Sequence, residues 1–165
     1  MKKYIPMILV LFLLLAGCGT APQPTEAPAP QLQIGNPWKN YESMAEAEAA
    51  SCLDFPIPEE ITDLYIAESF RVMNNSLLEV TYQDLAGSDC EVTVRMKSGE
   101  DEDISGVYED PDTIENQHIN GASITVKTKG QSCLYLISKN GYSYSLYAPN
   151  HFLGESADAF LSYIR

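Results

Sequence analysis

From residue 64 onward, apolar and polar side chains alternate with the period of two that is typical of β-strands. Between residues 77 and 83, the alternate positions Leu78, Val80 and Tyr82 are apolar and their neighbours are mostly polar. From Cys90 to Lys97, one alternate set is again apolar and the other is polar or charged. Each pattern predicts a half-buried antiparallel strand, with one face on a core and one toward water.

Further strands and two helices complete the expected domain. The other strands are predicted at 64–73, 122–128, 132–138 and 142–146, with Asn140-Gly141 as the clearest hairpin turn. Ser43-Met44-Ala45-Glu46 is a capping box that predicts a short helix to Ser51. A second helix is expected at the end of the chain, capped by Ser156 and with one apolar stripe formed by Ala157, Phe160, Leu161 and Ile164. We therefore predict an α+β domain in which a meandering antiparallel sheet carries one N-terminal and one C-terminal helix on its apolar face.

The first 17 residues have the pattern of a secretory signal, with a basic start and an apolar run from Ile5 to Leu15. As a helix this run is about 16 Å long, roughly half the hydrocarbon thickness of a bilayer, and so too short for a permanent span. It ends in Leu15-Ala16-Gly17-Cys18, which resembles a bacterial lipobox. The resemblance implies cleavage before Cys18 and diacylglycerol on its sulfur; the alternative is an ordinary signal with a cysteine nearby. Two acyl chains anchor a protein stably.

The expected organisation is a cleaved signal at 1–17, a lipidated tether at 18–37 and a single domain at 38–165. Five prolines interrupt the tether, and large apolar residues are nearly absent from it, so it is predicted to be semi-extended. The expected location is the outer face of the cytoplasmic membrane, reached through the Cys18 lipid anchor.

Several short motifs occur in a particular order along the domain. They are Phe55-Pro56-Ile57-Pro58-Glu59, then Val80-Thr81-Tyr82, then Asp103-Ile104-Ser105-Gly106-Val107-Tyr108, then the Asn140-Gly141 hairpin before the last helix. In this order the domain resembles the DUF4367 family of bacterial extracytoplasmic domains, over nearly all of 38–165. The resemblance implies an envelope domain of unknown biochemical role with no assigned catalytic residues, so no site is carried over. Cys52 departs from the pattern, because a helix-ending glycine is expected there.

The chain is acidic, with 10 basic against 23 acidic residues and a net charge of −13. Lys2 and Lys3 lie in the leader, so eight basic residues remain beyond it and the charge there is −15. This charge excludes nucleic acid and anionic headgroups as partners. It suits cations, basic protein surfaces or neutral ligands, and it is equally typical of a solvated surface.

Three cysteines remain beyond Cys18. Cys90 and Cys133 each lie on the apolar face of a predicted strand, so they form a disulfide if those strands are neighbours and are free core thiols if they are not. The histidines, His118 and His151, stand beside turn signals and in no nucleophile motif, and no Cys/His spacing typical of zinc is present.

An acidic loop is predicted at 98–115. Its carboxylates are hard oxygen ligands of the kind that calcium prefers, and the calcium candidates are Asp101, Asp103, Asp110 and Asp112. Their spacing lacks the order of an EF-hand. The alternative is a solvated loop without a metal.

Tyr135, Tyr142 and Tyr144 lie on the last two predicted strands. They are expected either to pack within the sheet, where tyrosine is favoured, or to line a groove for an apolar ligand.

Three classes of function fit this chain. The first is a non-enzymatic binding or sensing module on the cell envelope, with an envelope protein as partner. The second is a carrier of lipid or another apolar ligand, which predicts a deep cavity in a curved sheet. The third is an envelope hydrolase, which requires His118 or His151 in a cleft beside a carboxylate or hydroxyl.

Overall fold

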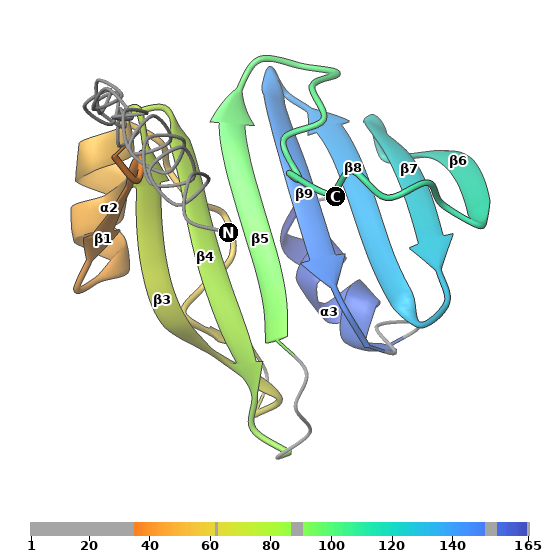
Figure 1. Cartoon of the computed structure of the whole chain (residues 1–165), viewed down its shortest axis with the longest axis horizontal. Coiled ribbons are helices and arrows are strands. Elements are labelled where there is room, and N and C mark those ends of the chain that lie inside the picture. The colour runs from red at the N-terminus through yellow and green to blue at the C-terminus, as the bar shows by residue number, and fades with distance from the viewer. Residues whose placement is uncertain (1–34, 62, 87–90, 151–154, 165) are drawn as a thin grey trace, which may run out of the picture. The chain divides into compact units, whose positions relative to one another are not determined.

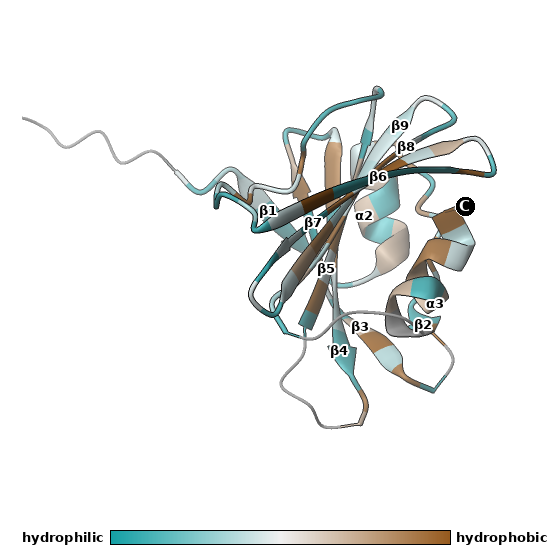
Figure 2. Ribbon diagram, turned by 90° about the vertical axis from the view of Figure 1, so that its right-hand side faces the viewer, coloured by the Kyte–Doolittle hydropathy of each residue, from teal (hydrophilic) through white to brown (hydrophobic). Residues whose placement is uncertain are grey.

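The structure, a computed structural model, describes residues 35–61, 63–86, 91–150 and 155–164. Within these residues, nine strands form one antiparallel sheet, and two helices lie on the same side of it (Figures 1 and 2). The predicted α+β architecture is therefore confirmed. Six of the strands lie within two residues of the predicted bounds.

The first half of the chain contributes β1 (Trp38–Tyr41), α2 (Met44–Ser51), β2 (Glu60–Ile61), β3 (Tyr65–Met73), β4 (Leu77–Asp84) and β5 (Glu91–Ser98). The second half contributes β6 (Thr113–Ile119), β7 (Ala122–Lys129), β8 (Ser132–Lys139), β9 (Tyr142–Ala148) and α3 (Glu155–Ile164). Across the sheet the order is β1-β3-β4-β5-β9-β8-β7-β6, with β2 paired to β3.

This strand order joins two meanders at a single seam, where β9 pairs with β5. The strand that follows β5 in the chain, β6, lies at the far edge of the sheet. The connection from β5 to β6 must therefore pass β9, β8 and β7, a distance of about 19 Å at the usual spacing between strands. Residues 99–112 make this crossing on the face opposite the helices (Figure 1).

The core lies between the sheet and the two helices. Phe160 of α3 is fully buried and packs edge-to-face on Tyr65 and Tyr82, with ring centroids 5.0 and 5.1 Å apart. The Tyr82 hydroxyl donates to the Pro58 carbonyl over 3.0 Å, which satisfies its polar atom inside the core. The predicted apolar stripe of α3 is confirmed, because Ala157, Phe160, Leu161 and Ile164 are all buried.

The first helix begins and ends as its sequence indicates. Ser43 is the N-cap and accepts from the Glu46 amide over 3.3 Å, while Glu46 accepts from the Glu42 amide, one residue before the cap. Cys52 ends the helix in the left-handed conformation, with φ 57° and ψ 32°. This left-handed conformation is the one that glycine adopts most easily, so the expectation of a glycine at this position has a structural basis.

Three strands, β1, β2 and β6, were not predicted from the sequence. Every residue of β6 up to His118 is exposed, so no alternation of apolar and polar residues marks it. The available signal was Asn120-Gly121, whose positive φ values of 51° and 80° form the hairpin turn into β7. The prediction of Ser156 as a cap was wrong, because α3 already begins at Glu155. Among the described residues, no helix has the length and apolar character needed to cross a membrane.

Candidate functional site

Residues 99–112, which we call the strap, are fastened to three strands of the sheet. The Asp101 amide donates to Ser138 Oγ on β8 over 2.9 Å, and the Glu102 amide donates to Ser143 Oγ on β9 over 3.2 Å. At the far end, the Asp112 amide donates to the Thr128 carbonyl on β7 over 2.7 Å. The predicted acidic loop is therefore hydrogen-bonded to the sheet along its length, although most of its residues are exposed.

A second, smaller apolar layer lies on the side of the sheet that the strap crosses, which we call the strap face. Leu77, Ile104 and Leu134 are buried but do not belong to the main core. Ile104 comes from the strap, whereas Leu77 and Leu134 come from β4 and β8. Burial of such side chains contributes about 1.5–3 kcal/mol each relative to exposure, so the strap is stabilised by packing as well as by hydrogen bonds.

The four calcium candidates do not assemble into a site. Asp103 Oδ2 accepts from Lys127 Nζ over 2.9 Å, and Asp112 Oδ2 accepts from the Gly130 amide over 2.9 Å. Asp101 and Asp110 contact the sheet through backbone atoms. Within the described part of the chain, no three His, Cys, Asp or Glu residues are placed to hold a metal ion. The carboxylates that contact the sheet there serve as strap fasteners, because the topology spreads them across several strands.

Asp103 is the best-fastened carboxylate of the strap. Its Oδ1 accepts from the Ser105 hydroxyl over 2.6 Å, in addition to the Lys127 ion pair on Oδ2. Burial by itself raises the pKa of Asp103, but the hydrogen bonds from Ser105 and Lys127 and the Lys127 charge together lower it below its ordinary value. Asp103 is therefore charged throughout the physiological pH range.

A cluster of charged side chains surrounds the buried carboxylate of Glu79 on β3, β4 and β5. Glu79, whose side chain is 1% exposed, accepts from Arg71 Nε over 2.6 Å and from Arg95 Nε over 2.8 Å. The Trp38 ring covers both guanidinium groups, at 5.1 Å from Arg71 and 5.3 Å from Arg95. The sequence places Glu79 and Arg95 on the polar face of their strands, which was predicted to face water. The strand register instead brings the charges together, because Glu79 is the direct cross-strand partner of both Arg71 and Arg95.

Arg95 also connects this cluster to the strap. Its Nη1 donates to the Ile104 carbonyl over 3.0 Å and to the Ser105 carbonyl. Gly106, at φ +68°, lets the strap approach this closely, because a Cβ there would lie 2.6 Å from Arg95 Nη1. The motif Asp103 to Tyr108 is thus largely a docking segment for the sheet.

Two hollows flank the strap. The larger, of about 350 Å³, is lined by Met73, Asn74, Ser76, Leu77, Arg95, Lys97, Glu102, Asp103, Ile104, Gly106 and Tyr108. The second, of about 270 Å³, lies beyond Asp103 over β7 and β8 and includes Lys127 and Leu136. Both combine charged and apolar side chains. Tyr108, at the rim of the larger hollow, is 95% exposed.

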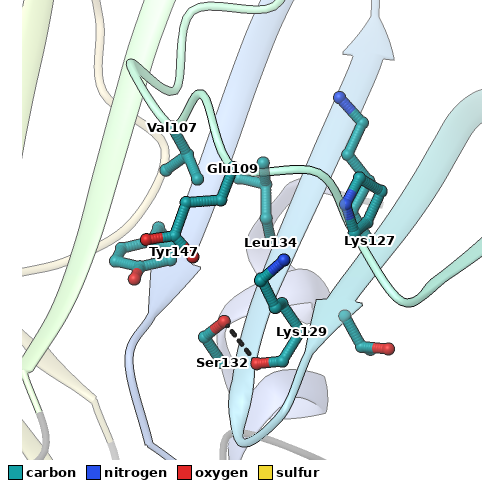
Figure 3. A pocket seen from close by; sticks show the side chains of 9 residues that line it. Val107, Glu109, Lys127, Lys129, Ser132, Leu134 and Tyr147 are labelled. Atoms are coloured by element: carbon teal, nitrogen blue, oxygen red, sulfur yellow. Dashed lines mark hydrogen bonds between the residues drawn. The ribbon is translucent and has the colours of Figure 1, made fainter.

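A third, narrow recess lies beneath the end of the strap (Figure 3). Val107 and Glu109 come from the strap, and Leu134 and Tyr147 come from the sheet beneath. Its volume of about 30 Å³ admits no more than a water or two. This recess is too small for an organic ligand.

The tyrosines predicted to pack or to line a groove lie on the core face. Tyr135 and Tyr144 are buried in the core, and Tyr142 packs against it. The rings of Tyr142 and Tyr144 are 6.4 Å apart, and burial raises the pKa of Tyr144. Their environment is that of sheet packing, on the opposite side from the two hollows.

Cys133 is a free buried thiol, and burial raises its pKa. The condition for a Cys90–Cys133 disulfide is not met, because β9 separates β5 from β8; Cys90 itself lies outside the described residues. Cys52 is free and exposed. Residues 1–34 are also not described, so the leader, Cys18 and most of the tether stay predictions.

The histidine prediction is only partly testable, because His151 lies outside the described residues. His118 is exposed on β6, with Nδ1 3.4 Å from Ser123 Oγ on β7. The pair thus has a hydroxyl, but His118 lies on an exposed strand surface, whereas the hydrolase alternative requires a cleft.

Comparison with known proteins identifies one family. The model of DUF4367, a domain of unknown function, matches residues 57–155. The match begins after β1 and α2, so it covers less of the domain than the predicted 38–165. It includes the strap, both hollows and Arg71, Glu79 and Arg95. No curated protein and no solved structure is detectably similar to the chain.

Proposed function

This chain belongs to the DUF4367 family, and we propose that it is a membrane-anchored, non-enzymatic binding or sensing module of the cell envelope. In this proposal, the strap face recognises an envelope protein. The lipobox-like sequence ending at Cys18 and the proline-rich tether support the anchoring, and the strap face supports the binding.

The observation that carries the binding role is the exposure of Tyr108. The strap residues before it in the family-like motif are buried, bonded or tightly packed, whereas Tyr108 is 95% exposed beside the larger hollow. Tyrosine contributes a large contact area at a low cost in conformational entropy, and it is enriched at binding hot spots. An exposed tyrosine on a rigidly held segment is therefore suited to protein recognition.

The chemistry of the larger hollow favours a protein partner over a lipid chain. Met73 and Leu77 offer apolar surface, whereas Lys97 and Glu102 place an ion pair in the same lining. A hydrocarbon chain would leave these charges without water, at a large cost in free energy. The face on which a carrier would hold its ligand is packed by α2, α3 and the buried tyrosines.

Site-specific photo-cross-linking in intact cells tests this proposal. A photo-reactive phenylalanine replaces Tyr108 in the full-length protein, and the matched control replaces Tyr163, an aromatic on α3 that is 40% exposed on the helix side. We expect a discrete protein adduct from position 108 and none from position 163. Lipid adducts alone at position 108 would support the carrier alternative, and equal adducts at both positions would contradict recognition by the strap face.

The anchoring part of the proposal has its own test. Mass spectrometry of the N-terminal fragment of the mature protein is expected to show Cys18 as the first residue, with added diacylglycerol. A Cys18→Ser variant should lose the lipid and leave the membrane fraction. An unmodified Cys18 in the wild-type protein would contradict lipid anchoring and leave the binding role of the strap face to be judged by the cross-linking.

A further inference from the structure

The two edge strands of the sheet, β1 and β6, differ in how well they are protected against pairing with a further strand. At one edge, β1 has only four residues, begins directly after Pro37, carries Lys39 and has α2 beside it (Figure 1). At the other edge, β6 has seven residues in continuous register with β7 and contains neither proline nor lysine. Natural sheets normally blunt exposed edges with such devices, because an open edge is a template for another strand. The β6 edge lacks the devices that protect β1.

The backbone groups that β6 presents outward follow from its hairpin. The two-residue turn Asn120-Gly121 makes Ile119 and Ala122 a hydrogen-bonded pair. Because bonding pairs alternate along an antiparallel ladder, residues 117, 115 and 113 also direct their N–H and C=O toward β7. Ile114, Asn116 and His118 therefore direct their N–H and C=O away from the sheet.

The side chains of these three residues do not cover the edge. Asn116 Oδ1 accepts from Thr125 Oγ1 over 2.8 Å, and His118 contacts Ser123, so both side chains are tied back to β7. Ile114 is 58% exposed and supplies an apolar contact next to the open backbone groups. The edge thus combines three outward donor and acceptor pairs with one apolar anchor.

The charge around β6 indicates which kind of partner strand this edge would bind. Glu115 is the one acidic residue of β6, which contains no lysine or arginine, and Asp110 and Asp112 lie just before it in the strap. The chain as a whole carries −13, so a second copy is repelled and a basic segment is attracted. We propose that the β6 edge binds an extended, basic segment of a partner protein, which adds to the sheet as a further antiparallel strand. This surface is distinct from Tyr108 and the larger hollow.

A synthetic peptide in which lysine and valine alternate tests this assignment, with the full-length protein in detergent. We expect it to bind and to slow hydrogen exchange at the amides of Ile114, Asn116 and His118. Asn116→Pro removes one outward N–H and is tolerated in an edge strand, so it should weaken binding at least tenfold. Asn116→Ala keeps the backbone donor and should change binding less than twofold.

The same peptide with methylated backbone nitrogens keeps its charge but has no backbone N–H groups, and we expect it not to bind. This comparison uses the unsubstituted protein, so it remains informative even if Asn116→Pro lowers the melting temperature. Equal binding of the methylated peptide, or protection confined to the strap, would overturn the proposal. A doubling of molecular mass with protection of the same amides in peptide-free samples would also overturn it, in favour of pairing between two copies.

Discussion

Arg95 Nη1 lies 3.0 Å from the Ile104 carbonyl oxygen, and this hydrogen bond fastens the strap to the middle of the sheet. The Nε of the same side chain donates to Glu79 over 2.8 Å. Glu79 is 1% exposed, and the two arginines beside it form ion pairs with its carboxylate. Attachment of the strap and compensation of a buried carboxylate therefore share one residue.

Replacement of Arg95 should release the strap and destabilise the fold. Arg95→Met leaves Glu79 with Arg71 alone and removes the donor to Ile104, and loss of one partner from a buried ion pair costs about 3 kcal/mol. We expect this loss in urea unfolding, together with faster hydrogen exchange in residues 100–107.

The matched control is Lys97→Met, two residues along the same strand. The Lys97–Glu102 pair is substantially exposed, so its loss should change the free energy of unfolding by no more than about 0.5 kcal/mol. Equal effects of the two substitutions would contradict a special role for Arg95.

Substitution of two glycines with similar φ values should distinguish the cost of backbone strain from the cost of a steric clash with a neighbouring side chain. Gly106 and Gly121 have φ values of +68° and +80°, but only at Gly106 would a Cβ meet another atom, Arg95 Nη1 at 2.6 Å. Gly121→Ala should cost about 1–2 kcal/mol for the left-handed backbone alone. Gly106→Ala should cost about 1–3 kcal/mol more, because the guanidinium must move. Unfolding free energies check the difference, and identical values would show that the strap does not need its close contact with Arg95.

Attachment of the strap should weaken in acid. The pKa of Asp103 is lower in the folded protein than its ordinary value of 3.8, so its contribution to stability is present above that value. The contribution is lost as the pH falls through 3.8 and on through the lower folded pKa. Hydrogen exchange of the strap, corrected for intrinsic rates, should rise in this window. In Lys127→Met the Asp103-dependent change should shrink, because the pKa of Asp103 then moves back toward its ordinary value.

The end of α2 offers a stabilising substitution. Cys52 adopts a left-handed conformation, which costs about 1–2 kcal/mol for a residue with a Cβ. Cys52→Gly should therefore raise the free energy of unfolding by about 1 kcal/mol, whereas Cys52→Ala removes the thiol but keeps the strain. A gain for alanine equal to that for glycine would assign the effect to the thiol rather than to the backbone.

Part of the candidate site was readable in the sequence. The motif from Asp103 to Tyr108 was identified as a family-like segment, and the acidic loop that contains it was identified as a candidate site. The arrangement of its carboxylates could not be predicted, because loop composition indicates available oxygens but not their positions. The structure distributes Asp101, Asp103 and Asp112 over β8, β7 and the β7–β8 turn instead of around one cation.

The sequence by itself determined the strands that have one buried face and the C-terminal helix with its apolar side, because burial imposes a period on the residues of each element. It determined the first helix through the capping box at Ser43 and Glu46. Only the tertiary structure decided that β9 pairs with β5 and sends residues 99–112 across the sheet. It also decided that Glu79 and Arg95, each on a polar strand face, meet beneath that strap. Local patterns report which face of an element is covered. They carry no information on which distant strand supplies the neighbour, because that choice depends on the summed packing of the whole sheet.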